Sequence, residues 1–442
     1  MRVRNICIKA FAAGFIAAGT FSAPLGAAAA SCSFADIDAN LAAVVRGDEG
    51  VGPAPAAALA VMRGGETVYA GAAGCAQIAP SGACDVAMTP HTKFRAASVS
   101  KLAAGFAALA LAAEGVLDLD KDVSGYYGFP VRNPAFPDTA ITVRQLLSHT
   151  SSVRDPAAYW VAAPGKFRAL IEDNPAAFAD RNEEGAAAAP GAYFVYANLN
   201  FGLLAGAMEH AAGARFDDIA RARVLAPLKL GAGFNWSGVA PEARRRGATL
   251  YRREGGAWAA QVDAADSLER DGPHILAEPG LDRRAYLETY RPGDNPTLFS
   301  PQGGLRASVV DLALLAREAR PGGAFAQAGE TQWTYDPARP NGDAAGGLYE
   351  QYGLAAQIVD YGGAEGSTLV GHAGEAYGLL SGAWALRSGE GAGRDVSFAY
   401  AVTGTDGDAA PGEKSGFTAI EETLIETALR AAQCDPAEDR GR

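Results

Sequence analysis

A serine stands three residues before a lysine at one place in the chain, Ser98-Val99-Ser100-Lys101. Side chains at positions i and i+3 of a helix project from one face, with Cβ atoms about 5–6 Å apart, so the lysine amine could reach the serine hydroxyl. The apolar run Leu102–Leu109 follows directly, and burial of Lys101 there would lower its pKa toward that of a general base. These residues predict a serine nucleophile, and the alternative is a helix-capping serine followed by a solvated lysine.

Two further short motifs combine residue types that serve in catalysis or substrate binding. In Tyr196-Ala197-Asn198 the phenol could relay a proton, and the amide could hold a lysine ammonium or a substrate carbonyl. The alternative is an aromatic packing residue next to a capping asparagine. His372-Ala373-Gly374 lies between two predicted strands and means little alone, because His-x-Gly is common. Together the three motifs indicate a catalytic site with Ser98 as its nucleophile.

The elements that would position these residues follow from apolar spacing and turn residues. Helices are predicted over 34–46, from Ser98 to Gly115, and over 199–212, 216–225 and 417–432. Strands are predicted over 57–62, 67–73, 352–359, 367–371, 379–386 and 396–402. Because strands occur near both ends of the chain with a mostly helical insertion between them, we expect one sheet assembled from the two ends.

Two more motifs extend the three above: Leu146-Leu147-Ser148-His149-Thr150-Ser151 and Ser300-Pro301-Gln302-Gly303-Gly304-Leu305. In this combination and order, the sequence resembles the serine β-lactamases and penicillin-recognising DD-peptidases, in the class C-like branch that also contains esterases and D-aminopeptidases. The resemblance implies a β-lactamase/transpeptidase-like α/β (α+β) fold with an antiparallel sheet flanked by helices. Its sheet lobe would span about 31–97 and 346–442, and an inserted, mostly helical lobe would span about 98–345.

The resemblance also implies a role for each residue at a matching position. Ser98 would be the acylated nucleophile, and Lys101 with Tyr196 would take its proton and later activate water. Asn198 would orient Lys101 and the substrate. The backbone N–H groups of Ser98 and Glu375 would form the oxyanion hole, which stabilises the negative charge of the tetrahedral intermediate.

The sequence departs from the family at His372-Ala373-Gly374, where many β-lactamases have Lys-Thr-Gly. The chain thus lacks the positive charge and the hydroxyl that meet a substrate carboxylate, and Glu375 adds a negative charge beside them. We count His372, Gly374 and Glu375 as candidate substrate-binding residues. We expect a substrate that has no free carboxylate at this edge, or one that presents an amine to Glu375.

The start of the chain is typical of a cleavable secretory signal peptide. Three basic residues precede an apolar stretch over 10–21, and a run of small residues ends at Ala30. The apolar stretch is too short and too interrupted to span a bilayer, which disfavours the alternative of a membrane anchor. We expect residues 1–30 to be removed and 31–442 to form one hydrolase domain, periplasmic or secreted, without stable membrane insertion.

Four cysteines would remain after removal of the leader, in an oxidising compartment. Cys75 and Cys84 would close a short loop between two strands, and Cys32 and Cys434 would tie the first helix to the last. The other pairings, and four free thiols, are the alternatives.

The net charge and the motifs of the sequence indicate which kinds of partner the protein could bind. The chain has 38 basic and 50 acidic residues and a formal net charge of −12, so nucleic acid is not an expected partner. The histidines lack the spacing of metal ligands and no cofactor motif occurs, so we expect neither metal nor cofactor. A small-molecule or peptide substrate is the expected partner, and the sequence leaves the oligomeric state open.

These observations favour a hydrolase that forms an acyl-enzyme with an ester or an amide. An esterase ranks first, a peptidase of D-amino-acid peptides or DD-carboxypeptidase second, and a β-lactamase third. An alternative from another class is a catalytically silent protein that binds a cell-wall ligand. Against it, a binding cleft has no need of a base beside a hydroxyl.

Overall fold

The computed structural model describes residues 33–48, 53–172, 174–179, 188–270, 272–343, 347–362, 368–387, 395–405 and 409–434. Its contacts separate residues 1–31 from a unit of residues 32–442, and the described residues all belong to the second unit. The predicted leader, residues 1–30, lies outside the described residues.

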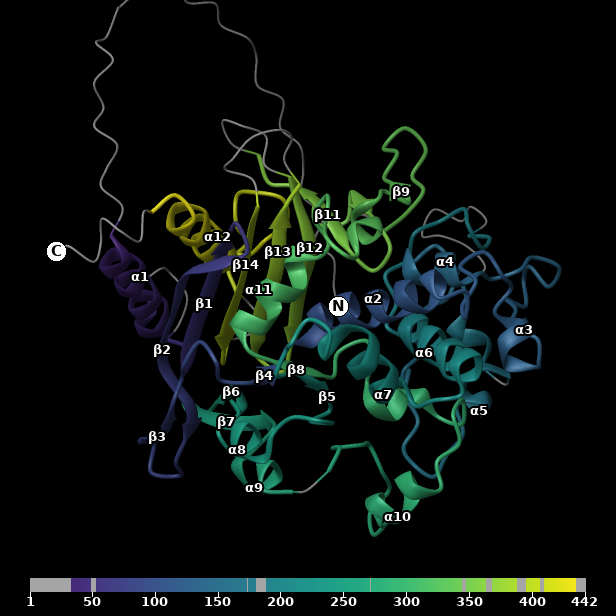
Figure 1. Cartoon of the computed structure of the whole chain (residues 1–442), viewed down its shortest axis with the longest axis horizontal. Coiled ribbons are helices and arrows are strands. Elements are labelled where there is room, and N and C mark those ends of the chain that lie inside the picture. The colour runs from purple at the N-terminus through teal and green to yellow at the C-terminus, as the bar shows by residue number, and fades with distance from the viewer. Residues whose placement is uncertain are drawn as a thin grey trace, which may run out of the picture. The chain divides into compact units, whose positions relative to one another are not determined.

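A nine-stranded antiparallel sheet joins the two ends of the chain (Figure 1). Its strands follow the order β3-β2-β1-β14-β13-β12-β11-β10-β9. From the first part of the chain come β1 (Ala56–Arg63), β2 (Glu66–Ile78) and β3 (Cys84–Ala87). From the last part come β9 (Trp333–Thr334), β10 (Gln351–Tyr352), β11 (Gln357–Asp360), β12 (Thr368–Ala376), β13 (Leu379–Leu386) and β14 (Val396–Thr403). Because β1 pairs with β14, the prediction of one sheet built from both chain ends is confirmed.

Helices cover both faces of this sheet. On one face lie α1 (Phe34–Arg46) and α12 (Ala419–Ala431), and α11 (Val309–Arg317) packs against the other (Figure 1). Successive side chains of a strand point to opposite faces, so Leu59 joins the apolar cluster of α1 and α12, whereas Ala60 joins the cluster that contains α11. Although α11 lies within the range predicted for the helical lobe, it packs on β13 and β14.

The helical lobe is built around two long helices, α2 (Ser100–Ala113) and α6 (Leu199–Ala212), which pack against each other. A 3-10 turn, η1 (Ala97–Val99), leads into α2. The shorter helical elements of the described residues are α3 (Ser124–Tyr127), α4 (Val143–Leu147), α5 (Arg168–Glu172), η2 (Pro175–Ala177), α7 (Phe216–Ala220), η3 (Arg221–Leu225), α8 (Pro241–Arg245), α9 (Ala265–Leu268), α10 (Arg283–Glu288), η4 (Pro296–Phe299) and η5 (Ala326–Gly329).

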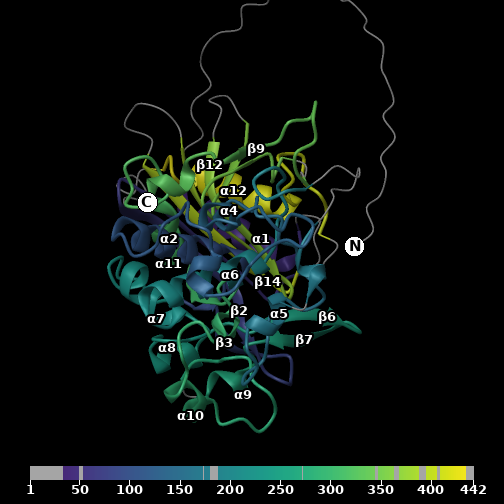
Figure 2. The same cartoon turned by 90° about the vertical axis from the view of Figure 1, so that its right-hand side faces the viewer.

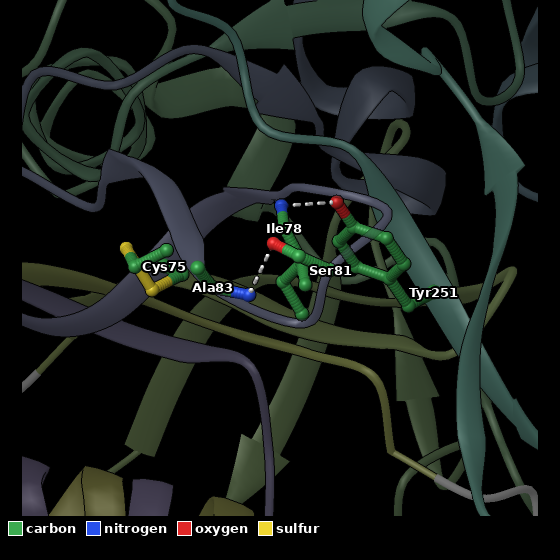
Figure 3. Close-up of a disulfide and its surroundings, with 6 residues drawn as sticks. Cys75, Ile78, Ser81, Ala83 and Tyr251 are labelled. Atoms are coloured by element: carbon green, nitrogen blue, oxygen red, sulfur yellow. Dashed lines mark hydrogen bonds between the residues drawn. A yellow bond between two sulfur atoms is a disulfide. The ribbon is translucent and has the colours of Figure 1, made fainter.

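Two small sheets complete the described elements. One has the order β4-β8-β5, formed by β4 (Phe94–Arg95), β8 (Leu305–Ala307) and β5 (Gly233–Phe234). The other is a hairpin of β6 (Leu250–Glu254) and β7 (Ala257–Val262), which extends beside the lower end of β2 (Figures 1 and 2). Tyr251 of this hairpin accepts a hydrogen bond of 2.7 Å from the backbone N–H of Ile78 in β2 (Figure 3).

Two predicted elements are divided in the structure. The predicted strand over 352–359 is two strands, because a tight turn closed by Gly353 N–H and Ala356 O, with Ala355 at φ +66°, reverses the chain. The predicted helix over 216–225 changes at Ala220 from an α-helix to a π-helical turn.

A disulfide joins Cys75 of β2 to Cys84 of β3, as the sequence predicted (Figure 3). The pairing of Cys32 with Cys434 stays a prediction, because Cys32 lies outside the described residues. Within the described part of the chain, no helix combines the length and the apolar character needed to cross a bilayer.

Candidate active site

The nucleophile candidate lies where β4 passes into α2. Ala97 adopts φ +48°, a left-handed backbone conformation that costs energy in a residue with a Cβ, and the buried surroundings of Ala97 hold it there. This sharp turn places half-buried Ser98 in η1, one turn ahead of Lys101. The Lys101 Nζ then donates a hydrogen bond of 3.0 Å to the Ser98 Oγ, as the i, i+3 spacing predicted.

Lys101 is fully buried and makes three hydrogen bonds through its amine. Besides Ser98, its acceptors are the Asn198 Oδ1 at 2.9 Å and the Gln302 carbonyl at 3.1 Å. Burial lowers the pKa of Lys101 to about 7, and the negative charge of Asp155 acts in the opposite direction. A large fraction of the amine is therefore neutral at neutral pH and can accept a proton from Ser98.

Tyr196 lies beside the Lys101 amine. Its ring centroid is 4.7 Å from the Lys101 Nζ. Burial raises the pKa of Tyr196 well above its usual value, the nearby phenols of Tyr349 and Tyr352 raise it further, and a hydrogen bond with Ser98 acts against this rise. The phenol is therefore protonated at neutral pH, which makes it a relay or donor of a proton beside the Lys101 base. The structure brings the hydroxyl, the amine and the phenol into one site.

Asn198 begins α6 but does not cap it. Its side-chain amide bonds Lys101, and the first N–H of the helix, that of Leu199, donates instead to the Asp155 Oδ1 at 2.8 Å. The Asp155 Oδ2 also accepts a hydrogen bond of 2.9 Å from the Asn198 Nδ2. Asp155 thus takes over the capping function and fixes the Asn198 amide with its oxygen toward Lys101. The alternative of a capping asparagine does not describe this residue.

The loop that contains His149 holds the Tyr196-Ala197-Asn198 segment. The buried His149 Nδ1 lies 3.2 Å from the donating Ala197 N–H and 3.0 Å from the Asn200 Nδ2. Because Nδ1 accepts, the ring proton is on Nε2. The His149 carbonyl also accepts from the Val195 N–H at 2.9 Å, and the imidazole ring packs against Tyr196. The ring therefore fixes the loop as a hydrogen-bond acceptor.

The glycine turn over 300–305 supplies a third partner for Lys101, the Gln302 carbonyl. The turn is tied to α2 because the Ser100 Oγ accepts a hydrogen bond of 2.9 Å from the Leu305 N–H. A Cβ at Gly304 would lie 2.7 Å from the Ser300 Cβ and 2.8 Å from the Asn235 Oδ1, so glycine is required there. The glycine turn therefore positions a carbonyl against the Lys101 amine.

The three candidate residues on β12 differ in burial and in their distance from the cavity at Ser98. His372 is fully buried, and it is not among the residues that line the cavity at Ser98. Its Nδ1 lies 2.6 Å from the Ala373 carbonyl and must donate to it, so Nε2 accepts from the Tyr352 hydroxyl at 3.1 Å. Burial lowers the pKa of His372 to about 3, which keeps the ring neutral. His372 supports β12 from behind the site.

Gly374 and Glu375 lie nearer to the nucleophile. A Cβ at Gly374 would approach the Ala96 carbonyl to 2.7 Å and the Ser98 N to 3.3 Å, so the absence of a side chain lets β12 pack against the nucleophile turn. Glu375 is exposed and lines the cavity at Ser98.

The catalytic cavity has a volume of about 200 Å³. We use this name for the space lined by Ser98, Asn198, Gln302, Glu375 and neighbouring side chains. Four large side chains of the lining were not predicted from the sequence: Arg95, Tyr159, Arg252 and Tyr377. The position of Arg95, three residues before Ser98, was a sequence signal that could have marked it as a site residue. No sequence signal marked Asp155, because its place beside Asn198 depends on how two loops meet. Among the described residues, no group of three or more His, Cys, Asp or Glu side chains is placed to hold a metal ion.

Comparisons with known proteins agree with this arrangement. A profile of the family described as Beta-lactamase matches residues 41–419. A D-aminopeptidase of Brucella canis is 31% identical over 176 residues, which cover 40% of this chain and 32% of the relative. Protein flp of Staphylococcus aureus strain N315 is 34% identical over 119 residues, 27% of this chain and 23% of the relative. The matches thus span a third or less of these relatives' length.

A solved structure shows the same fold. The D-amino acid amidase of Ochrobactrum anthropi SV3, in complex with L-phenylalanine, superposes with a TM-score of 0.59 over 92% of this chain and all of its own (100%). Their sequence identity is 16%, so this likeness concerns the fold alone.

Proposed function

The chain belongs to the beta-lactamase family and is a serine hydrolase related to β-lactamases, and we propose that it hydrolyses an ester or amide through an acyl-enzyme on Ser98. One observation carries this proposal. The Ser98 hydroxyl is hydrogen-bonded to a buried Lys101 amine whose pKa is lowered to about 7. A neutral amine in contact with the hydroxyl is the requirement for generating a serine nucleophile near neutral pH.

In the first half of the proposed reaction, Ser98 Oγ attacks the substrate carbonyl carbon and Lys101 Nζ takes the hydroxyl proton. The backbone N–H groups of Ser98 and Glu375 would stabilise the resulting oxyanion. The tetrahedral intermediate collapses when the bond to the leaving group breaks. Tyr196, beside both Lys101 and Ser98, passes a proton to the leaving amine or alcohol and regains one from Lys101.

In the second half, water replaces the leaving group. Lys101 and Tyr196 together take a proton from the attacking water, which adds to the acyl carbonyl carbon, and the bond to Ser98 Oγ breaks as the oxygen is reprotonated. Asn198, itself held by Asp155, keeps the Lys101 amine aimed at Ser98 throughout. The products are a carboxylic acid and the free enzyme.

A second candidate is narrower: hydrolysis of amides or peptides of D-amino acids. Exposed Glu375 lines the catalytic cavity and could pair with a free substrate amine. Relatives and structural neighbours named D-aminopeptidase and D-amino acid amidase support it. Such a substrate also fits the proposed export of the chain through a leader over residues 1–30.

The test compares reagents that report on different parts of the proposal. The purified protein is incubated with a fluorophosphonate, p-nitrophenyl acetate, the p-nitroanilides of D- and L-alanine, and a labelled penicillin, and adducts are located by mass spectrometry. We expect a Ser98 adduct and ester turnover that Ser98→Ala abolishes. Turnover of the D- but not the L-anilide would establish the second candidate. No adduct with any reagent would instead favour a silent binding protein. Efficient turnover of the labelled penicillin, or of a cephalosporin added as a further substrate, would contradict the expected discrimination by Glu375.

A further inference from the structure

A second and larger cavity, of about 370 Å³, adjoins the catalytic cavity. We call it the side cavity, and its lining includes Arg95, Tyr159, Trp160, Asp263, Leu276 and Tyr377. Arg95, Tyr159 and Tyr377 line both cavities, so the two spaces meet along these side chains. A substrate whose carbonyl lies at Ser98 can therefore extend a group past Arg95.

The rim of the side cavity is unusually apolar for a surface. Among the described residues, four large apolar side chains stand out as exposed, and three of them belong to this lining. They are Trp160 at 43%, Leu276 at 41% and Tyr377 at 39% exposure. Aromatic and branched side chains left in water around a concave site indicate a place for an apolar group of a ligand.

The charges of the side cavity do not balance. Buried Arg306 is matched by buried Asp263, through two hydrogen bonds of 2.9 Å between guanidinium and carboxylate. Arg95 has no carboxylate partner among the described residues. Its Nη2 donates to the Ser300 hydroxyl at 3.2 Å, its guanidinium lies 5.0 Å from the Tyr377 ring centroid, and its buried Nε has no hydrogen-bond partner.

Neighbouring groups leave this charge in place at neutral pH. Burial lowers the pKa of Arg95 to about 10, with the positive charge of Arg306 acting in the same direction, so the guanidinium stays protonated. Burial also lowers the pKa of His274, another lining residue, to about 4, so this imidazole adds no charge. The side cavity thus carries one uncompensated positive charge at its junction with the catalytic cavity.

We propose that the side cavity binds an aromatic or branched apolar group of the substrate that bears a carboxylate, and that this carboxylate pairs with Arg95. The proposal rests on the proposed function, in that the bound group belongs to the ester or amide attacked by Ser98. It places the substrate's negative charge away from Glu375, which lies instead between the catalytic cavity and a small cavity of about 60 Å³. An amine at Glu375 and a carboxylate at Arg95 are compatible in one peptide-like substrate.

The test is a binding measurement that needs no turnover. Isothermal titration calorimetry on the Ser98→Ala protein compares 3-phenylpropionate with 3-phenylpropionamide, which have nearly the same shape but differ in charge. We expect the acid to bind at least about tenfold more tightly, as one charge-assisted hydrogen bond to a desolvated cation supplies. Equal binding of the acid and the amide would overturn the proposal.

Variants identify the groups responsible. Arg95→Gln should abolish the preference for the acid, and Arg95→Lys should retain part of it. The matched control Arg253→Gln removes an equal charge from an exposed position on β6, outside the lining of either cavity, and should retain the whole preference. A preference that survives Arg95→Gln contradicts the assignment.

A second variant keeps the proposal testable should Arg95→Gln fail to fold. Trp160→Ala, at an exposed rim position, should weaken binding of the acid and the amide by the same factor, because it removes apolar contact and no charge. Unchanged binding of both ligands in Trp160→Ala would overturn the side cavity as their site. Failure of Ser98 labelling, by contrast, would overturn the proposed function and leave these binding results unaffected.

Discussion

Lys101 is fully buried, and its burial favours the neutral amine with a free electron pair. Burial removes the water that would stabilise the ammonium, and the three acceptors around Nζ replace that water only in part, so the pKa falls to about 7. The carboxylate of Asp155 limits this fall. Burial therefore sets most of the basicity of the site, and Asp155 moderates it without a hydrogen bond to Ser98 or Lys101 among the described residues.

Asp155→Asn should shift the pH dependence of activity. Loss of the carboxylate lowers the pKa of Lys101 further, so the rise of kcat/KM with pH moves to lower pH than in the unaltered protein. The plateau should fall about tenfold, because the one carbonyl oxygen of asparagine cannot replace both carboxylate oxygens that accept from the Leu199 N–H and the Asn198 Nδ2. The pH profile of p-nitrophenyl acetate hydrolysis measures both effects. The control Asp138→Asn removes an exposed carboxylate elsewhere, and an equal shift in the control would contradict the role of Asp155.

Glu375→Gln tests the recognition of a substrate amine. If Glu375 pairs with an ammonium group, kcat/KM for D-alanine p-nitroanilide should fall about tenfold or more relative to that for p-nitrophenyl acetate, which has no amine. The ratio of the two values isolates recognition, because any disturbance of the backbone N–H of Glu375 affects both substrates. An unchanged ratio would rule out this amine site.

At the scale of elements, the site is assembled from the starts of two helices, a glycine turn and one strand. The turn η1 contributes Ser98, the first turn of α2 contributes Lys101, and the start of α6 contributes Asn198. The 300–305 turn and β12 close around them, each at a glycine where a Cβ would collide with a neighbour. The precision of the site therefore depends on close backbone packing between segments distant in sequence.

Two adjacent glycines of the turn offer a matched comparison. In Gly304→Ala the new Cβ would lie 2.7–2.8 Å from Ser300, Asn235 and Phe299 atoms, whereas in Gly303→Ala its nearest neighbour, the Arg95 Nη2, is 3.6 Å away. We expect Gly304→Ala to cost about 1–3 kcal/mol of unfolding free energy and Gly303→Ala to cost less than about 1 kcal/mol. Urea denaturation followed by circular dichroism measures both. Equal losses would show that the turn tolerates a Cβ at Gly304.

Apolar spacing and turn residues in the sequence correctly predicted those helices and strands whose bounds depend on neighbouring residues alone. The helices over 34–46 and 199–212 and the strand over 379–386 have the predicted bounds, because each carries a long, regular apolar pattern between clear turn residues. The turn at Ala355 was missed because the left-handed position is an alanine in an apolar run, where Gly353 alone is a weak turn signal. The division of the 216–225 helix was missed because no Gly or Pro lies at the break.

Contacts within the site could be predicted from the sequence where the spacing of two residues along one helix brings their side chains together. Ser98 and Lys101 meet because they are three residues apart on one helical face, whereas the approach of Tyr196 rested on a family resemblance. Asp155 and the side cavity could not be predicted, because they arise where several loops converge. The burial of the His372 side chain on β12 likewise depends on the packing of Tyr352, which lies on another strand of the sheet.

At the scale of the whole molecule, the site lowers the stability of the fold, because burying the Lys101 amine costs unfolding free energy. A folded-state pKa of about 7 for Lys101, against about 10.4 in an unfolded chain, means that the unfolded state binds more protons between these values. The contribution of Lys101 to the free energy of unfolding therefore rises with pH from about 7 to 10.4. Below pH 7 the fold bears the full cost of burying the charged ammonium. Other interactions of the fold must therefore offset this penalty.

Lys101→Met removes this titration and should flatten the pH dependence of stability. Between pH 7 and 9.5, the unfolding free energy of the unaltered protein should rise by about 2–3 kcal/mol relative to that of Lys101→Met. Urea titrations at several pH values, under non-reducing conditions that keep the Cys75–Cys84 disulfide, measure the difference. Parallel curves for the two proteins would show that Lys101 keeps its ordinary pKa in the folded state.

The most direct measurement of the central claim, that Lys101 activates Ser98, is the pH dependence of Ser98 acylation. The second-order rate constant for fluorophosphonate labelling is followed by mass spectrometry between pH 5 and 9, with the adduct located by peptide mapping. We predict a single rise with a midpoint near the lowered pKa of about 7, label on Ser98 only, and loss of the rise in Lys101→Arg. A rate independent of pH over this range, or label on a residue other than Ser98, would contradict the claim.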